Sequence, residues 1–324
     1  MEKTILLHKL VKFQSVLALL VMCFALSLLS DRFLTAENSW NVMRQISVNL
    51  IISVGMTLVI LTGGIDLSVG SVLAFSGAVT AFLLKTGAEI TSINLYIGFT
   101  LTGALIGGIL TGTILGWFNG ITITRFKVPP FVATLAMLTI ARGLTMLLTG
   151  GFPITGFSNR MSFIGTGWFL GIPMPVWISA AAVAGAVVLT RKTRLGRYIY
   201  AIGGNETAAI LSGVKIRKVK MIVYAAAGAL SAIGGIIITS RLDSAQPNAG
   251  SGFELDSIAA VVIGGTSLSG GKGTIMGTVQ GALIIGILNN GLVLLDVSPF
   301  WQQVIKGLVI LAAVMIEKIN SKEA

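Results

Sequence analysis

Residues 63–71 have the sequence GGIDLSVGS, in which one carboxylate stands among three glycines and two serines. Asp66 is the only charged residue between Arg44 and Lys85, and apolar runs flank it on both sides. Such a carboxylate can accept hydrogen bonds from backbone N–H groups that a break between helices leaves free, or it can bind a polar solute. The residue types favour the structural role, because the glycines permit tight turns and Ser68 can cap the next helix.

A second glycine-rich stretch, GGTSLSGGKGT at 264–274, has the composition of a phosphate-binding loop. The pattern G-x-x-x-x-G-K-[ST] needs a lysine directly after its second glycine, but Gly271 follows Gly270 here. Lys272 is followed by Gly273, where a hydroxyl that binds Mg²⁺ is required. The sequence therefore excludes ATP binding at this stretch.

Groups for catalysis or metal binding are scarce in the rest of the chain. The only histidine, His8, lies in a basic N-terminal tail, and the only cysteine, Cys23, lies inside an apolar run. No HExxH, CxxC or GxSxG motif occurs. We therefore predict no catalytic residue, no metal site and no cofactor, as expected for a protein that is not an enzyme.

The composition indicates a membrane protein. The 324 residues are 54% hydrophobic and 11% charged, with a mean hydropathy of +0.90. Soluble domains carry about 25% charged residues, so a soluble fold of this length would lack the charges to cover its surface. We predict an all-α polytopic membrane protein in which residues 1–324 form a single transmembrane domain.

Apolar stretches of about 20 residues are long enough to cross a bilayer. The sequence predicts about ten transmembrane helices, at 13–30, 45–62, 67–84, 95–116, 129–148, 175–190, 219–240, 257–270, 274–295 and 299–316. Segment 257–270 is short for a span and contains Gly264 and Gly265. It is therefore expected to be a broken or re-entrant helix, which is stable only where protein or a water-filled cavity covers its backbone.

Basic residues gather on one side of the predicted membrane. They cluster at the ends of apolar runs without interleaved aromatic residues, so the net charge of +11 does not indicate binding of nucleic acid. With the N-terminus in the cytoplasm, the inner segments hold 16 of the 23 Lys and Arg residues and the outer segments hold five. This bias predicts a multi-pass protein with both termini in the cytoplasm.

Glycines recur at helical spacing in two segments, every four residues from Gly108 to Gly120 and from Gly273 to Gly281. Helix faces without side chains can approach each other closely, so both stretches predict helix packing. The sequences GGIDLSVG and GGTSLSGG also share the pattern GGxxLSxG. Repeats with glycine-interrupted helices point to a transport pathway, although both copies fall on the same predicted side, so either one copy is re-entrant or the similarity is accidental.

The longest predicted cytoplasmic loop, 191–220, contains a signal for a short helix. Asn205 can cap its N-terminus, Glu206 complements the helix dipole, and Gly213 can end it. The helix would run over residues 206–212 and expose three side chains, those of Ala208, Ala209 and Leu211. So short a helix is unstable alone. It suits docking against a partner, with binding to anionic lipid headgroups as the alternative.

Three stretches carry a resemblance to a known family: ILTGGIDLSVGS, TRLGRYIYAIGGNETAA and SAQPNAGSGFELDSIAAVVIGGTSLSGGKG. They resemble the permease subunits of bacterial ABC importers for monosaccharides, over most of the chain. The match at 244–273 favours the ribose-importing members. The resemblance is weakest at residues 1–40 and 85–125.

The resemblance implies a homodimer in the bacterial inner membrane, with a cytoplasmic ABC ATPase and a periplasmic sugar-binding protein as partners. The outer loops 150–175 and 241–256 would then dock the binding protein. By the same analogy, eight residues form the ATPase-coupling segment: Arg194, Gly196, Arg197, Gly203, Asn205, Glu206, Ala209 and Gly213.

A sugar permease needs weak polar groups along its path, because tight binding would slow release. The candidates for the translocation pathway and its broken helices are Asn49, Thr57, Gly63, Gly64, Asp66, Ser68, Ser71, Gly264, Gly265, Asn289 and Asn290. The alternative is an ion-coupled secondary sugar transporter. Such a transporter needs intramembrane carboxylates as a relay, and Asp66 is the one plausible candidate.

Overall fold

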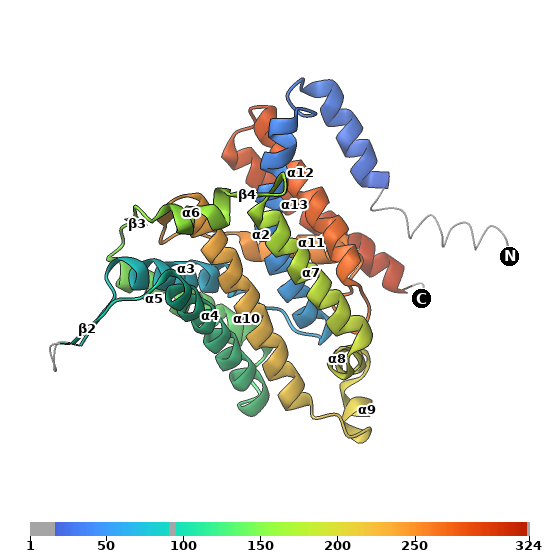
Figure 1. The fold of residues 1–324 in the computed structure, drawn as a ribbon. Coiled ribbons are helices and arrows are strands. Elements are labelled where there is room, and N and C mark those ends of the chain that lie inside the picture. The colour runs from blue at the N-terminus through green and yellow to red at the C-terminus, as the bar shows by residue number, and fades with distance from the viewer. Residues whose placement is uncertain (1–16, 91–94, 323–324) are drawn as a thin grey trace.

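The computed structural model describes residues 17–90 and 95–322, and its regular structure there is mostly helical (Figure 1). Besides the helix Leu17–Leu29, the helices are α2 (Ala36–Leu61), α3 (Val69–Lys85), α4 (Leu101–Arg125), α5 (Pro130–Thr149), α6 (Asn159–Thr166), α7 (Met174–Lys192), α8 (Arg194–Gly204), α9 (Glu206–Leu211), α10 (Ile216–Arg241), α11 (Phe253–Ile263), α12 (Ile275–Leu294) and α13 (Pro299–Lys322). The strands are β1 (Ala88–Ile90), β2 (Leu95–Ile97), β3 (Ile154–Thr155), β4 (Trp168–Phe169), β5 (Ile172–Pro173) and β6 (Ser244–Ala245), paired as β1–β2, β3–β6 and β4–β5. The all-helical class is confirmed.

Six helices of the described residues are long and apolar enough to cross a membrane: α2, α4, α5, α7, α10 and α12. Helix Leu17–Leu29, α3 and the Pro299–Met315 part of α13 are shorter apolar helices. A total of about ten spans therefore stays a prediction. His8 and the start of the first predicted span lie outside the described residues.

The predicted ends of the spans differ from the structure. Helix α2 begins at Ala36 rather than at residue 45, and α4 continues to Arg125 rather than ending at residue 116. Hydropathy does not predict the first turns of α2 or the last turns of α4, because these turns contain polar side chains. Threonine caps mark the starts instead: the Thr35 hydroxyl accepts the Asn38 N–H at 3.3 Å, a bond that satisfies one free donor of the first turn.

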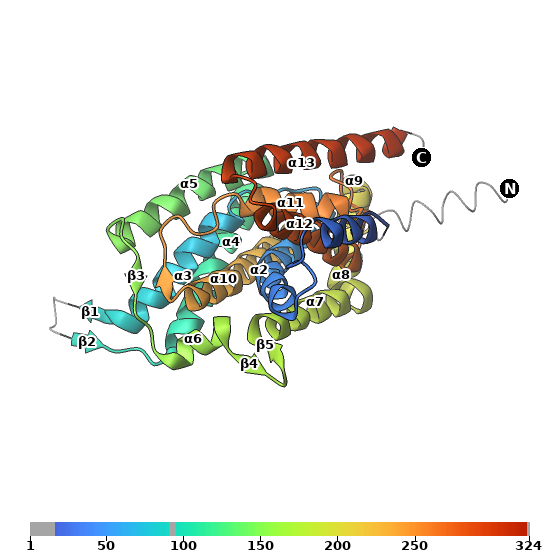
Figure 2. The ribbon, with the colours of Figure 1, turned by 90° about the horizontal axis from the view of Figure 1, so that it is seen from above.

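Helix α10 lies at the centre of the bundle. It packs against α4 and α3 on one side and against α2 on the other, and α12 packs against both α2 and α11. Figures 1 and 2 show the same division, with α3, α4 and α5 on one side of α10 and α2, α11 and α12 on the opposite side. Helices α2, α11 and α12 therefore pack against one another on one side of α10.

The glycine spacing has the predicted packing role. A Cβ on Gly112 of α4 would overlap the carbonyl oxygen of Gly228 in α10 and lie 2.8 Å from the Ala232 Cβ. Gly277 of α12 contacts Gly264, just beyond α11, in the same way. Small residues let these helix backbones approach each other, and van der Waals contact at this range holds membrane helices together.

The two loops that the sequence predicts to be outer, 150–175 and 241–256, pair with each other. Ile154 of β3 lies opposite Ala245 of β6, and the Phe157 N–H donates to the Asp243 carboxylate at 2.9 Å. Arg142, a cation inside the fifth predicted span, donates to the carbonyl oxygens of Pro247 at 2.6 Å and Ala249 at 2.9 Å. The guanidinium thereby ties α5 to the loop between α10 and α11.

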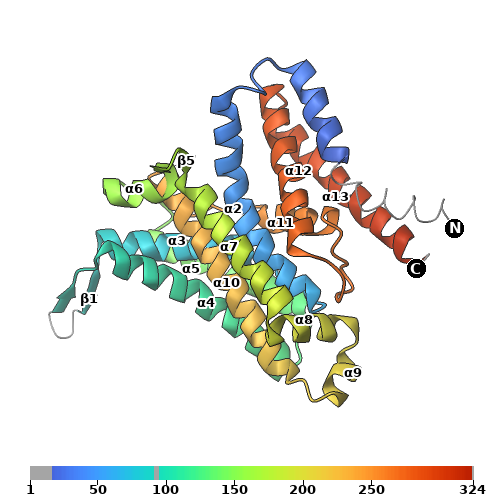
Figure 3. The ribbon, with the colours of Figure 1, turned by 45° about the vertical axis from the view of Figure 1, so that its right-hand side comes forward.

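Helix α8 occupies the first part of the predicted loop 191–220, where the sequence predicts only the short helix at 206–212. Its N-terminus is capped by Thr193, whose hydroxyl accepts the Gly196 N–H at 3.1 Å. Ile199 and Ile202 are buried while Arg194 on the same helix is exposed, so α8 is amphipathic. Apolar residues spaced for a helix face were present in the sequence, but the basic residues between them concealed the pattern. Figure 3 shows α8 and α9 together at one end of the bundle.

Candidate functional site

The break between α2 and α3 is built around Asp66, which is 2% exposed. Its Oδ1 accepts the backbone N–H of Ser68 at 2.9 Å and the Ser68 hydroxyl at 2.6 Å. The Ser68 hydroxyl also accepts from the Asn119 side chain of α4 at 3.0 Å. The carboxylate thus acts as an acceptor for a backbone N–H freed at the break, as predicted.

The prediction that Ser68 caps α3 is wrong. Ser68 occupies the position before the helix, but its side chain makes no capping hydrogen bond to the first turn. Its backbone has φ = −83° and ψ = −8°, in the helical region rather than the extended conformation of a capping residue, and its hydroxyl oxygen accepts from Asn119 instead. Ser71 donates to the Ser68 carbonyl oxygen at 2.9 Å, inside the same turn.

The glycines of this break are required by their surroundings. Gly63 has φ = 75°, in the left-handed region that side chains disfavour. A Cβ on Gly64 would overlap the hydroxyl of the buried Tyr224 in α10. Asp66, Ser68 and the glycines therefore form a structural turn beyond the C-terminal end of α2.

A polar cavity of about 140 Å³ lies toward the opposite end of α2. It is lined by Gln45, Val48, Asn49, Ile238, Arg241, Phe253, Asp256, Asn289, Val293, Gln302 and Lys306. With about 30 Å³ for each water molecule in the liquid, this space corresponds to roughly four or five waters. Two predicted pathway residues from distant parts of the sequence, Asn49 and Asn289, meet here.

The amide oxygens of Asn49 and Asn289 are buried and have no hydrogen-bond partner among the described residues. Charge at the cavity is balanced only in part. Lys306 of α13 and Asp256 of α11 form an ion pair at 3.2 Å, with the carboxylate side chain 7% exposed, and Arg241 lines the same wall. The cavity therefore presents neutral acceptors beside an ion pair and one further cation, Arg241, a surface suited to a polar solute.

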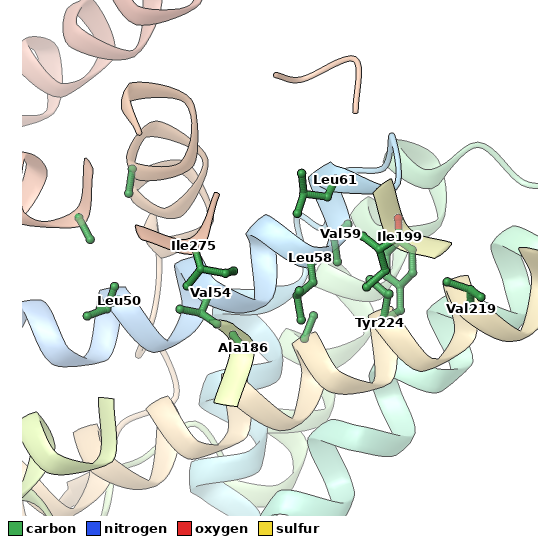
Figure 4. Close-up of a cluster of buried hydrophobic side chains, with 14 of the residues drawn as sticks. Leu50, Val54, Leu58, Val59, Leu61, Ala186, Ile199, Val219, Tyr224 and Ile275 are labelled. Carbon is green, nitrogen blue, oxygen red and sulfur yellow. The ribbon is translucent and has the colours of Figure 1, made fainter. Parts of the chain in front are cut away.

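The stretch of α2 and α12 beyond the cavity is closely packed. The hydroxyls of Thr57 in α2 and Thr278 in α12 are hydrogen-bonded at 2.7 Å, and both residues are fully buried. Val54, Leu58 and Ile275 of the same two helices belong to a larger apolar cluster, and Figure 4 shows Ile275 beside Val54. Along α2, Val54, Thr57 and Leu58 lie between the cavity residue Asn49 and Leu61, which contacts α8.

Asn290, also a predicted pathway residue, is tied to the start of α2. Its side-chain amide donates to the Asn38 side chain at 2.8 Å, and Asn38 donates back at 3.1 Å. This reciprocal pair positions α12 against α2. Asn290 is not among the residues that line the cavity.

The second glycine-rich stretch follows α11, which has 11 residues. At 1.5 Å rise per residue, such a helix is about 16 Å long, about half of the hydrocarbon thickness. Gly265 has φ = 81° and turns the chain after Gly264. The loop then returns to the first break, where the Gly271 N–H donates to the Leu61 carbonyl oxygen at 3.1 Å. The two similar stretches therefore lie in contact.

The short helix predicted after Asn205 is present as α9. The Asn205 side chain accepts the Ala208 N–H at 2.9 Å, and Gly213, with φ = 78°, follows the helix end. Glu206 forms an ion pair with Lys220 at 2.8 Å. These local features confirm the capping prediction.

The predicted exposed face of α9 needs one correction. Ala208 is exposed and Leu211 is 84% exposed, but Ala209 is buried at 4%. The cause is contact with the rest of the protein, because Ala209 packs in the cluster that contains Ile202 and Val219. The exposed apolar surface is formed by Ile210, 58% exposed, together with Leu211.

The remaining coupling candidates lie on α8. Arg194 and Arg197 are exposed, whereas Gly196 is buried against the Leu189 and Thr190 carbonyl oxygens of α7. Gly203, at the other end of α8, contacts Leu61 and Gly271. The α8–α9 segment therefore touches both glycine-rich breaks.

Long apolar helices, two glycine-rich turns in contact with each other, and a separate polar cavity are typical of a polytopic membrane transport protein. Residues 38–314 match the family described as "Branched-chain amino acid transport system / permease component", and the chain belongs to this family. It is a transport permease component rather than an enzyme.

Individual relatives extend over nearly the whole chain. The ribose import permease protein RbsC of Haemophilus influenzae is 50% identical over 312 residues, covering 95% of this chain and 93% of the relative. RbsC of Bacillus subtilis is 50% identical over 94% of this chain and 92% of its own length. The D-allose transport system permease protein AlsC of Escherichia coli is 39% identical over 95% and 91%. No solved structure matches the chain.

Proposed function

We propose that the chain is the membrane-spanning subunit of an ATP-driven, binding-protein-dependent importer of ribose. The observation that carries this proposal is the 50% identity to ribose import permeases along nearly the full chain. The identity to the xylose permease of Haemophilus influenzae, at 35%, is lower. The family description names branched-chain amino acids, so an amino acid is the substrate class that a test must separate from sugars.

The cavity supports a neutral solute. Asn49 and Asn289 offer unpartnered amide oxygens, and the Asp256 carboxylate is already paired with Lys306. Sugar hydroxyls can donate to such oxygens, and a sugar oxygen can accept from Arg241 in the same wall. Weak, neutral contacts also let the solute leave, which transport requires.

The same subunit would receive energy through α8 and α9. Ile210 and Leu211 have exposed side chains and stand in the sequence between Arg197 and the basic start of α10. A partner ATPase with an apolar, acid-rimmed groove fits this surface.

We propose that residues 1–324 form one domain of about ten spans in the inner membrane, with both termini in the cytoplasm. Two copies would form the functional permease. The predicted outer loops 150–175 and 241–256 would dock the sugar-binding protein.

An ion-coupled transporter is less well supported. Asp66 accepts two hydrogen bonds from Ser68 in a tight turn, and Asp256 is paired with Lys306. Neither carboxylate is placed as an exchangeable ion site between the two sides. The relatives' names also describe import systems with separate permease components.

A substrate panel tests the proposal. The complex with its ATPase and binding protein is reconstituted in vesicles, and uptake of ribose, allose, xylose and leucine is measured with ATP inside the compartment that corresponds to the cytoplasm. We expect ATP-dependent ribose uptake in excess of the other three. Preferential uptake of leucine would contradict the assignment to sugars.

A further inference from the structure

The hairpin of β4 and β5 carries an exposed apolar tip. Trp168 and Phe169 of β4 pair with the two residues of β5, and Leu170 and Gly171 form the loop between the strands. Trp168 and Phe169 are each about half exposed, and Leu170 is 78% exposed. Three consecutive large apolar side chains thus lie open at one point of the surface, and such a patch marks a contact with a partner or a membrane.

Leu170 occupies a backbone position that disfavours leucine. Its φ is 51° and that of Gly171 is 75°, and positive φ at both loop positions is the mark of a type I′ turn. Asn, Asp or Gly ordinarily take the first position, because a bulky side chain is strained at positive φ. Burial within the described residues does not offset this strain, since the side chain is mostly exposed. An apolar contact outside the protein would offset it.

Aromatic contacts hold the hairpin against both α2 and α7. The Trp168 ring meets Trp40 of α2 edge to face, with ring centroids 5.5 Å apart, and Phe169 meets Trp177 of α7 at 6.2 Å. The Trp177 indole N–H also donates to the Phe169 carbonyl oxygen at 3.0 Å. The exposed tip is therefore presented by a hairpin that is fixed on two helices.

Helix α7 places the hairpin at the border of the bilayer. The helix has 19 residues, about 28 Å at 1.5 Å rise per residue, close to the roughly 30 Å of the hydrocarbon core. Its last turn carries the exposed Arg191 and Lys192, whose charges belong in a headgroup region. Its first residue, Met174, directly follows β5. The hairpin therefore lies at the opposite headgroup region, on the outer side in the proposed topology.

The exposed side of α7 is apolar along its length. No charged residue occurs between Trp177 and Arg191, and Ser179 and Thr190 are buried. The exposed residues in this stretch are Ala180, Ala181, Ala184, Gly185 and Val188. Figure 2 shows β4 and β5 beside α6 and α7 at the edge of the bundle, across from α5 and α13. In a membrane span such a face suits lipid chains, and the hairpin tip continues it at the level of the headgroups.

Arg44 of α2 supplies a cation beside the tip. Its Cζ lies 4.8 Å from the centroid of the Trp168 ring, and its Nε is buried without a hydrogen-bond partner among the described residues. Neither of the two salt bridges within the described ranges involves Arg44. A phosphate oxygen accepts well from a guanidinium, and an uncompensated cation at the bilayer border attracts anionic headgroups.

We propose that the β4–β5 hairpin is a lipid anchor in the outer leaflet. Trp168, Phe169 and Leu170 lie at the boundary between headgroups and acyl chains, where aromatic side chains are favoured, and Arg44 binds the phosphate of a glycerophospholipid beside the Trp168 ring. An anionic headgroup is preferred because the Arg44 charge has no carboxylate partner within the described residues. The inference goes beyond the proposed function, since it does not depend on the transported solute. It leaves segments 150–166 and 241–256 of the predicted outer loops to a soluble partner.

The first experiment locates the tip relative to the bilayer. Leu170→Cys in a Cys23→Ser background is labelled with a bimane, and the complex with its ATPase is reconstituted in vesicles. Asn248→Cys is the water-facing control, because Asn248 is exposed in the other predicted outer loop. Phospholipids brominated on their acyl chains should remove most of the bimane emission at position 170 and little at 248. Aqueous iodide should do the reverse.

Two results of this experiment would overturn the anchor. One is iodide quenching at position 170 equal to that at position 248. The other is a label at 170 that brominated lipid does not quench and that loses its access to iodide when the binding protein is added. The second result would place the tip against a protein instead of the bilayer.

The second experiment measures the lipid preference that Arg44 confers. Trp168 is kept as the only tryptophan, with the other four replaced by Phe, which retains the ring contacts. Its quenching by brominated phosphatidylglycerol is compared with quenching by brominated phosphatidylcholine. We expect phosphatidylglycerol to be preferred about fivefold, the effect of one basic residue near an anionic surface. Arg44→Gln should abolish the preference, and Arg44→Lys, which keeps the charge, should retain it.

Arg32→Gln is the matched control, because it removes an exposed cation that does not lie over Trp168. It should leave the preference unchanged. Equal preferences in wild type and Arg44→Gln, or no preference in wild type, would contradict the assignment of Arg44 to a lipid phosphate. Ribose import by the wild-type complex is scored separately: its failure would contradict the proposed function and leave the quenching results as the test of the anchor.

Discussion

The backbone N–H of Gly271 donates a hydrogen bond to the carbonyl oxygen of Leu61 at 3.1 Å. This bond joins the end of α2 to the loop after α11. Gly203 of α8 lies against both partners, and a Cβ there would overlap the Leu61 oxygen and the Gly271 nitrogen and lie 3.0 Å from the Gly270 carbonyl carbon. The helix that leads into α9 thus contacts the two helix breaks without an intervening side chain.

This junction predicts a glycine-specific coupling step. Gly203→Ala should push α8 away from Leu61 and Gly271, so that ATP hydrolysis by the partner continues while ribose import falls at least about tenfold, the equivalent of about 1.4 kcal/mol. The measurement is the ratio of sugar imported to ATP hydrolysed in the reconstituted complex.

Gly204→Ala is the control for this prediction, because a Cβ on Gly204 has no neighbour within 4 Å. It should retain a ratio close to wild type. Equal effects of the two alanine variants would show that helix propensity, rather than contact at the junction, determines the result.

Tyr200 supplies a second link in the same region. Its hydroxyl donates to the Gly273 carbonyl oxygen at 2.9 Å, and burial raises the pKa of the phenol, so it stays protonated at neutral pH. We expect Tyr200→Phe to lower stability by about 0.5–1.5 kcal/mol and to reduce coupling less than Gly203→Ala does. Thermal unfolding and the import-to-hydrolysis ratio measure the two effects. A Tyr200→Phe protein with wild-type stability and a lower import-to-hydrolysis ratio than Gly203→Ala would contradict this order.

Substitutions distinguish a structural role of Asp66 from a role on the sugar path. Asp66→Ala removes the acceptor for both Ser68 bonds and should destabilise the protein by about 1–3 kcal/mol. Asp66→Asn retains an oxygen acceptor of the same shape and should lose less. Thermal unfolding of the purified permease tests the order. Wild-type stability in Asp66→Ala, with altered sugar flux, would instead place the carboxylate on the path.

The Asp256–Lys306 pair should behave as a unit. Lys306→Met leaves the Asp256 carboxylate, 7% exposed, without its cation. We expect the free energy of unfolding to fall by about 2 kcal/mol. Breaking a fully buried pair costs roughly 3–5 kcal/mol, and the cost is lower here because Lys306 is partly exposed. The double variant Asp256→Asn/Lys306→Met should recover most of this loss. Additive losses in a double-mutant cycle would show that the two groups act independently.

Local chemistry in the sequence predicted the parts that depend on near neighbours. Asp66 and Ser68 are two residues apart, and the Asn205 cap lies three residues from its donor at Ala208. Glycine spacing likewise predicted close helix packing, because a helix face without side chains lets any neighbouring helix approach closely.

The cavity and the junction could not be predicted in the same way. Asp256 and Lys306 are 50 residues apart, and Thr57 and Thr278 are 221 apart, so only the packing of helices brings each pair together. Nothing in the sequence indicates that the Ser53 and Ser257 hydroxyls lack hydrogen-bond partners among the described residues, because a serine in a transmembrane segment ordinarily bonds within its own helix. Their lack of partners is visible only in the fold.

In the proposed mechanism, ATP hydrolysis by a separate subunit drives a sugar through this permease. The most direct test measures ribose accumulation in vesicles that contain the permease, its ATPase and its binding protein, with internal ATP clamped and an uncoupler present. We expect accumulation that continues with the uncoupler and stops when the ATPase is inactivated. Accumulation that collapses with the uncoupler while ATP is held constant would contradict it.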